Sequence, residues 1–255
     1  MNNLTTKFGS TDLTDEDIER LADERSGAGM EDREEDRVQS WVKVLHQLSP
    51  ELNMRQPNYV EGAKAGDIWI AGRQLLISGA QGFDFLPVVY RLEWVEWPGQ
   101  PGSGGRPIAR YSKAPEQHGG TQSAPGKIDL PNGHQIIETR YFMGIIFGHD
   151  EPFPAILTFT STGTNQATNW IQRIRSKKNA SGKMAPIYRY VWHVTTIPMS
   201  NKSGQEWYLL RAGKETLATA EQFKMGVEAD DKARDNKLKI EEDAAVQQSI
   251  DQLPF

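Results

Sequence analysis

A segment with many bases and no acids lies in the middle of the chain. Residues 152–205 contain no aspartate or glutamate, although the whole chain has 34 acids among 255 residues. The bases of this segment are Arg173, Arg175, Lys177, Lys178, Lys183, Arg189 and Lys202. Lysine and arginine bind phosphates and release the counterions that surround a nucleic acid, which gives affinity without sequence preference. The pattern is therefore typical of a surface that binds a polyanion.

Large aromatic residues are interleaved with these bases. Trp170, Tyr188, Tyr190 and Trp192 fall inside the segment, and Trp97 borders a stretch rich in glycine and proline. Exposed ring faces stack on unpaired bases, and each stacked base contributes about 1–3 kcal/mol. On a strand, Tyr188, Tyr190 and Trp192 would share one face. Such a face is typical both of a buried core and of a ligand platform, and the sequence leaves the two interpretations open.

The densest group of bases is expected at the end of a helix or in the loop after it. There it would form a cationic edge for phosphates, although bases near a helix C-terminus also stabilise the helix dipole. The candidate nucleic-acid-binding residues are Arg173, Arg175, Lys177, Lys178, Lys183, Arg189, Trp97, Trp170, Tyr188, Tyr190 and Trp192.

The chain lacks the common motifs of catalysis. It has no dinucleotide-binding fingerprint, no Walker A loop, no His-Glu-x-x-His and no nucleophile elbow. Its histidines are scattered without the spacing of metal ligands: His46, His118, His134, His149 and His193. We therefore expect a protein that is not an enzyme and that uses no metal or cofactor. The rival hypothesis is an enzyme that cleaves nucleic acid with magnesium held by Asp67, Asp84, Asp129, Asp150 and Glu151.

The composition predicts a soluble protein of a reducing compartment. The chain has no cysteine, which excludes disulfides, thiolate zinc sites and cysteine nucleophiles. Residues 1–10 lack the apolar core of a signal peptide, and the apolar runs are too short to span a bilayer. We expect a cytoplasmic protein without membrane contact.

Charge is segregated along the chain. Residues 1–40 carry 12 acids and 5 bases, residues 41–225 carry 14 acids and 20 bases, and residues 226–255 carry 8 acids and 4 bases. A basic body between acidic ends indicates a polyanion partner, which the net charge of −5 conceals. We expect an acidic flexible arm at 1–37, a nucleic-acid-binding core at 38–225 and an acidic tail at 226–255.

Hydrophobic periodicity predicts a core with more strands than helices. The apolar residues Val38, Trp41, Val42, Leu45 and Leu48 fall on one face of a helix. Strands are predicted at 68–70, 74–77, 85–97, 135–147 and 155–160, with a hairpin formed by 187–197 and 206–211. Further helices are predicted at 163–176 and from about 214 to 227, and residues 98–126 are predicted to form a long mobile loop.

The expected fold class is α+β, mainly β, with about five to seven antiparallel strands and one or two helices. The simplest architecture is an OB-like antiparallel barrel with a long loop rich in glycine and proline, flanking helices and disordered acidic ends. A β-sandwich is the competing architecture.

The last residues of the chain resemble a known docking peptide. The sequence ends in Asp251, Gln252, Leu253, Pro254 and Phe255, after an acidic stretch at 241–243. This ending resembles the C-terminal tip of bacterial and phage single-stranded DNA-binding proteins. In that family the final aromatic residue and carboxylate dock into basic, apolar pockets on replication and repair proteins. The resemblance implies the same docking role for Asp251, Leu253, Pro254 and Phe255, whereas Gln252 departs from the usual run of acids.

Together these features favour a single-stranded DNA-binding protein of phage replication or recombination. Residues 49–53, 59–63 and 66–68 also resemble uncharacterised phage proteins from replication gene clusters. Such a protein would coat unpaired DNA and recruit replication or recombination proteins through its C-terminal tip. The alternative is a structural or assembly protein of a virion that does not bind DNA. The sequence leaves the oligomeric state and the choice between DNA and RNA open.

Overall fold

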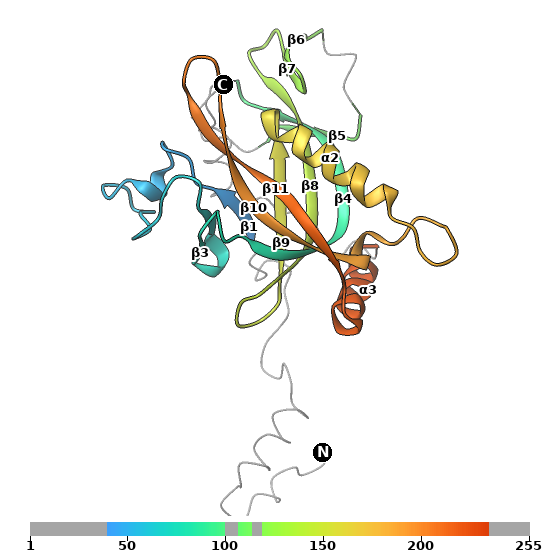
Figure 1. Cartoon of the computed structure of the whole chain (residues 1–255). Helices are drawn as coiled ribbons and strands as arrows, with labels where there is room; N and C mark the ends of the chain where they lie inside the picture. Colours follow the sequence, from blue (N-terminus) through green and yellow to red (C-terminus); the bar gives the residue numbers. More distant parts are fainter. Residues whose placement is uncertain (1–39, 100–106, 114–118, 235–255) are drawn as a thin grey trace, which may run out of the picture. The chain divides into compact units, whose positions relative to one another are not determined.

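The computed structural model describes residues 40–99, 107–113 and 119–234, which belong to the compact unit Gln39–Phe255. These residues form a mainly β fold (Figure 1). Its strands are β1 (Trp41–Val44), β2 (Ile68–Ile70), β3 (Leu75–Ile77), β4 (Phe83–Trp97), β5 (Ala109–Tyr111), β6 (Thr121–Ala124), β7 (Lys127–Asp129), β8 (Gln135–Phe147), β9 (Phe153–Thr160), β10 (Tyr190–Ser200) and β11 (Glu206–Leu217). The described helices are α2 (Thr164–Ser176) and α3 (Ala220–Arg234). Neither is long and apolar enough to cross a membrane.

Within the described part of the chain, the strands make one 11-stranded sheet. Its order is β11-β10-β4-β8-β9-β1-β2-β3, and β5, β6 and β7 extend it beside β4 and β8. The pairing is antiparallel except between β1 and β9. The longest pair, β4 with β8, runs from Asp84 opposite Phe147 to Trp97 opposite Gln135. This pair is the spine on which the other elements are placed.

A bulge allows the spine to contain a proline. Pro87 has no N–H to donate to the ladder, and the register of β4 against β8 shifts between Pro87 and Val89. The bulge brings β4 close to Gly144 of β8, where a Cβ atom would lie 2.1 Å from the Leu86 carbonyl oxygen. A residue without a side chain is therefore required at this point of β8.

The sheet curls around α2, because buried side chains from β1–β4 and from β8–β11 all pack in the cluster that contains this helix. The buried residues of α2 are Ala167, Trp170, Ile171 and Ile174, at the spacing of one helix face. Trp170 is the centre of the cluster, with its ring stacked on Phe142 at 4.2 Å. The rings of Phe85 and Trp192 each lie 6.0 Å from it. Figure 1 shows α2 lying across the sheet.

The second helix, α3, covers part of the opposite face of the sheet. Leu86 follows the α2-facing Phe85 in β4 and therefore points the other way. Leu86, Ile145, Val191 and Ala218 form a buried cluster there. Phe223 of α3 and the half-buried Tyr188 pack against this cluster, with their ring centroids 5.4 Å apart.

The expected fold class, mainly β with flanking helices, is confirmed. The predicted strand at 135–147 is β8, those at 68–70 and 85–97 are β2 and most of β4, and the predicted hairpin is β10 with β11. The predicted helix at 163–176 is α2 with the 3-10 turn before it. The described sheet has more strands than expected because several short strands extend its edges.

The helix predicted over Val38–Leu48 is wrong where the chain is described, because Trp41–Val44 forms β1. Trp41 packs in a buried cluster with Tyr141 and Ile156, whereas its neighbour Val42 packs in the α2 cluster. Both faces of β1 are therefore covered. A strand buried on both faces carries consecutive apolar residues instead of alternating ones. Here the consecutive Trp41 and Val42 fitted the apolar spacing of a helix, which led to the wrong prediction.

The stretch 98–126 is not a loop throughout. Ala109–Tyr111 pairs with β4, and Thr121–Ala124 pairs with β7. Residues 100–106 and 114–118 lie outside the described residues, as do the predicted arm at 1–37 and the predicted docking tip, Asp251, Leu253, Pro254 and Phe255.

Candidate nucleic-acid interface

The cationic segment begins in the last turn of α2. The apolar spacing of this helix ends at Ile174, and Lys177 already has an extended backbone. Arg173 and Arg175 lie in the last turn, where positive charge is favourable for the helix dipole. Arg173 and Lys177, four positions apart, reach the same acid on β11, whereas Arg175 between them is exposed and has no described ion pair.

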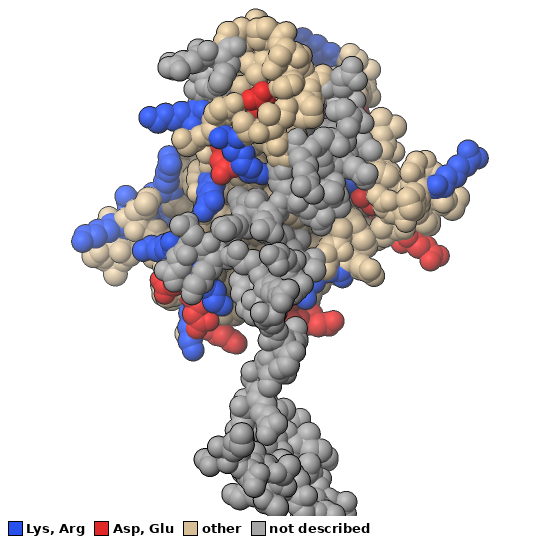
Figure 2. Space-filling view, turned by 180° about the vertical axis from the view of Figure 1, so that it is seen from behind, with Lys and Arg blue, Asp and Glu red and all other residues tan. Residues whose placement is uncertain are grey.

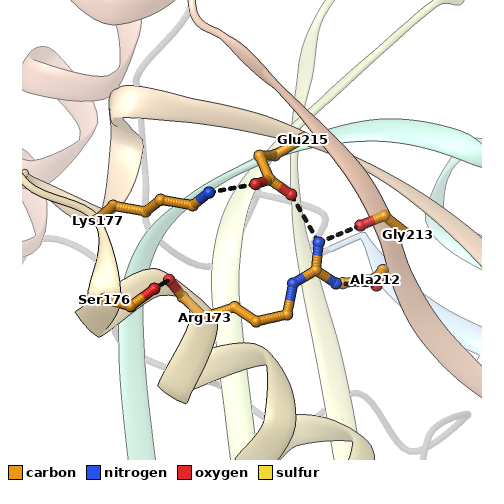
Figure 3. Close-up of polar contacts among 6 residues, drawn as sticks. All are labelled: Arg173, Ser176, Lys177, Ala212, Gly213 and Glu215. Atoms are coloured by element: carbon orange, nitrogen blue, oxygen red, sulfur yellow. Dashed lines mark hydrogen bonds and ion pairs between the residues drawn. The ribbon is translucent and has the colours of Figure 1, made fainter.

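Arg173 ties α2 to β11 (Figure 3). Its guanidinium donates to the backbone carbonyls of Ala212 at 2.8 Å and Gly213 at 2.6 Å, and to the Glu215 carboxylate at 2.6 Å. The guanidinium also lies 4.6 Å from the centre of the Trp192 ring. These contacts use the fixed fork of donors that distinguishes arginine from lysine, so Arg173 has a structural role at this position.

Lys177 shares the same carboxylate. Its ammonium group donates to the second oxygen of Glu215 and lies 5.3 Å from the centre of the Tyr190 ring. The hydrogen bond from Lys177, together with the weaker one from Arg173, holds the pKa of Glu215 below its ordinary value despite some desolvation. Glu215 therefore stays ionised and balances part of the positive charge at the end of α2. The pairing joins residues 38 positions apart, and the acid lies outside the acid-free segment.

Three other bases at this place are exposed: Arg175, Lys178 and Lys183. The loop that carries the two lysines is ordered by Asn179, whose side-chain oxygen accepts the N–H groups of Ser181 and Lys183 at 3.0 Å. We call Arg175, Lys177, Lys178 and Lys183 the cationic edge. In Figure 2 the lysines and arginines are densest on the left of the view, which is the side where α2 ends in Figure 1.

Three of the predicted ring residues are buried. Trp97, Trp170 and Trp192 are only 6%, 2% and 0% exposed. Their faces are covered by other side chains, so a base cannot stack on them in this fold. Of the alternating residues Tyr188, Tyr190 and Trp192, only Trp192 is a buried core residue, while the two tyrosines are half-buried. The candidate interface therefore does not include Trp97, Trp170 or Trp192.

The remaining predicted residues divide between two places. Tyr190 is half-buried and lies beside the cationic edge. Tyr188 lies in a 3-10 turn before β10 and packs on Phe223 of α3. Arg189 lies 5.8 Å from the centre of the same Phe223 ring. The structure therefore does not bring Tyr188 and Arg189 together with the cationic edge by any described contact.

Two ring residues on β4 were not among the predicted site residues. Tyr90 and Trp94 are half-buried and point to the same face of the strand, the face on which Phe142 packs against Tyr90. Burial raises the pKa of the Tyr90 hydroxyl, and the positive charges of Arg140 and Arg175 oppose that shift. Arg140 is engaged by Glu138 at 2.6 Å. The alternation in 90–97 was a sequence signal for this face, but only the fold shows that its rings are partly open.

The acids of the rival enzyme hypothesis lie apart or have protein partners. Asp67 accepts backbone N–H groups of Lys64 and Gly79, and Asp84 pairs with His193 at 2.9 Å. Among residues that the structure describes, no group of three or more His, Asp or Glu side chains is placed to hold a metal ion. The described carboxylates therefore give no observation on which a metal mechanism can be built.

A cavity of about 100 Å³ lies between β1, β9 and β11, lined by Val42, Phe159, Leu210 and His46 among others. His46 is 9% exposed, and its ring nitrogen Nδ1 is buried without a hydrogen-bond partner among the described residues. Burial, followed by the positive charge of Lys43, lowers the pKa of His46 from 6.5 to about 4. The imidazole is therefore uncharged at neutral pH.

Acidification should destabilise the protein through His46. The unfolded chain binds a proton at the ordinary pKa of 6.5 and the folded chain only near 4, so the unfolded state takes up protons first. The neutral ring contributes its full share of the unfolding free energy above pH 6.5. About 3 kcal/mol of the unfolding free energy is lost as pH falls from 6.5 to about 4. Urea unfolding across this pH range should show a smaller loss for His46→Gln than for the wild type. Equal losses would assign the pH dependence to other groups.

Comparison with known proteins places this chain among phage proteins. A family model described as "Pam3 phage gp34-like protein" matches residues 14–239. A search of curated proteins found no match. The matched range contains all the described residues, including the cationic edge and the two rings of β4.

Proposed function

The chain belongs to the Pam3 phage gp34-like protein family, and from this premise we propose that it is a phage protein that binds single-stranded DNA without sequence preference. The observation that carries the proposal is the cationic edge, with partly open aromatic rings beside it. The proposed role is to coat unpaired DNA during replication or recombination. Catalysis is not part of this role.

The charges at the end of α2 support contact with a phosphate backbone. Arg175, Lys178 and Lys183 are exposed, and the described residues give none of them an ion pair with an acid. Each base that neutralises a phosphate releases counterions, so affinity falls as salt rises. The absence of acids from 152–205 removes the repulsion that a nearby carboxylate would add.

The rings support a preference for single strands over duplex. Tyr190 lies against Lys177 of the cationic edge. The positive charge of Arg175 acts on the Tyr90 hydroxyl and opposes the rise of its pKa. Trp94 follows Tyr90 on the same face of β4. Only an unpaired base can present its face to such rings, and stacking accepts every base type. A strand that follows the edge would therefore meet both phosphate and base contacts.

Two finer expectations complete the proposal. The curled sheet would serve as an OB-like barrel, an architecture that binds oligonucleotides on the sheet face. The C-terminal tip, with Asp251, Leu253, Pro254 and Phe255, would recruit replication or recombination proteins, as its resemblance to single-stranded DNA-binding proteins implies. Both the protein and its partners would act in the cytoplasm of the host.

The test is a titration of the full chain with an oligo(dT) of about 30 nucleotides, in which tryptophan fluorescence reports binding. We expect quenching that weakens strongly between about 50 and 200 mM salt, with much weaker binding of a duplex of the same length. Trp94→Phe should reduce the quenching, whereas Trp69→Phe, a half-buried tryptophan of β2, should leave it unchanged.

Two results would overturn the proposal. Absence of binding at low salt, with a stable ring or lattice of the protein in solution, would favour the virion assembly role. Cleavage of the oligonucleotide that requires magnesium would favour the enzyme.

A further inference from the structure

We propose that Glu215 occupies, in the unbound protein, the place of one phosphate of the bound strand, so that binding exchanges one anion for another on Lys177. The inference rests on the proposed DNA binding and assigns a particular phosphate site within the cationic edge. It also gives the protein a built-in competitor for that site.

The geometry around Glu215 is that of an occupied anion site (Figure 3). One carboxylate oxygen accepts from the Arg173 guanidinium and the other from the Lys177 ammonium. A guanidinium and an ammonium that converge on two oxygens can bind a phosphate in the same manner as a carboxylate. The side chains are within reach of solvent, because Lys177 is 28% exposed and Glu215 is 21% exposed.

The two cations differ in their freedom to exchange partners. Arg173 is held by two backbone carbonyls of β11 and by the face of Trp192, independently of Glu215. Lys177 follows the last residue of α2 and has a flexible side-chain stem, and the described hydrogen bond of its ammonium group is to Glu215. We therefore assign the exchange of anions to Lys177, while Arg173 stays bound to β11 and keeps α2 and β11 in position.

The exchange requires little reorganisation. An ion pair that is partly exposed to water stabilises a protein only weakly, so a phosphate can replace the carboxylate without a large penalty. The exposed Arg175 and Lys178 lie two positions before and one position after Lys177 in the sequence and attract the next phosphates of the same strand. A single small anion does not gain the attraction of Arg175 and Lys178 and so competes poorly with Glu215 for Lys177. Glu215 therefore makes the site selective for chains of phosphates over isolated phosphates.

The experiment is a double-mutant cycle on the full chain with Lys177→Gln, Glu215→Gln and the combined variant. Binding of oligo(dT) is measured at several salt concentrations. Glu215→Gln should raise affinity about 3- to 10-fold at 50 mM salt, because Lys177 then binds its phosphate without first releasing a carboxylate. The salt slope should steepen by up to about 0.7, because binding no longer frees a carboxylate that takes up a cation in place of the one released from the strand. Lys177→Gln should cost less than about 2-fold alone but about 5-fold or more in the Glu215→Gln background, because only there is Lys177 fully available.

The matched control is Glu206→Gln, which removes an exposed acid of the same strand β11 and makes the same change in net charge. If Glu206→Gln raises affinity as much as Glu215→Gln, the effect is general electrostatics and the inference fails. It also fails if Lys177→Gln costs the same in both backgrounds. In either case the wild type still binds DNA and the proposed function stands. If wild type and variants all fail to bind, the proposed function falls as well.

Discussion

Replacing Arg175, Lys178 and Lys183 by glutamate is expected to weaken binding of oligo(dT) by about 100-fold or more at 50 mM salt. The three residues are exposed at the end of α2 and in the ordered loop after it. Each substitution removes a phosphate contact and adds a repulsive charge. The slope of log affinity against log salt should also become shallower by about 2, because three contacts on a single strand are lost. Fluorescence titrations at several salt concentrations measure both quantities.

The matched control reverses three exposed bases elsewhere, Arg55, Lys64 and Lys202. The segment with Arg55 and Lys64 and the turn between β10 and β11 lie on the opposite side of Figure 1 from the end of α2. The control changes the net charge by the same amount and should weaken binding only slightly through the long-range field. Equal losses in the two triple variants would mean that the cationic edge is not the site.

Trp170→Ala should cost about 3–5 kcal/mol of unfolding free energy, the range for a large aromatic removed from a core. Trp170 is 2% exposed and contacts rings from β4, β8, β9 and β10. Its removal leaves a cavity between α2 and the sheet, where the helix cannot collapse onto several strands at once. Urea unfolding followed by circular dichroism measures the loss.

Two further variants show whether the loss is specific to this position. Trp170→Phe keeps an aromatic ring in the core, should retain the fold and should cost clearly less than the alanine variant. Trp69→Ala removes a half-buried tryptophan of β2 and should cost about 1–2 kcal/mol. If Trp170→Ala were no more destabilising than Trp69→Ala, the assignment of Trp170 as the centre of the core would be wrong.

The sequence predicted the regular elements better than it predicted the site. Residues 90–97 alternate between two faces, residues 135–147 are rich in β-branched and aromatic side chains, and α2 has the spacing of an amphipathic helix, so local sequence was sufficient for these elements. β1 was missed because its burial depends on β9 and β2, which lie far along the chain. No local pattern can report that both faces of a strand are covered.

The candidate site depended on the same kind of long-range information. An aromatic strand face gave no means to distinguish a platform from a core, and Trp192 proved to be 0% exposed. The acid-free segment correctly located exposed bases, but Glu215, which lies beyond its end, reaches back to two of them. Charge counted along the chain therefore overestimates the positive charge that is available in space.

The two carbonyl groups that Arg173 binds belong to the last strand of the sheet, since β11 pairs only with β10 among the described strands. The unpaired backbone groups of such an edge strand can pair with a strand of another molecule. In many proteins, charged side chains or a covering element prevent this pairing. Here a helix side chain occupies the acceptors at that point. Arg173, first considered as a DNA contact, thus covers backbone acceptors of the border strand with a helix side chain.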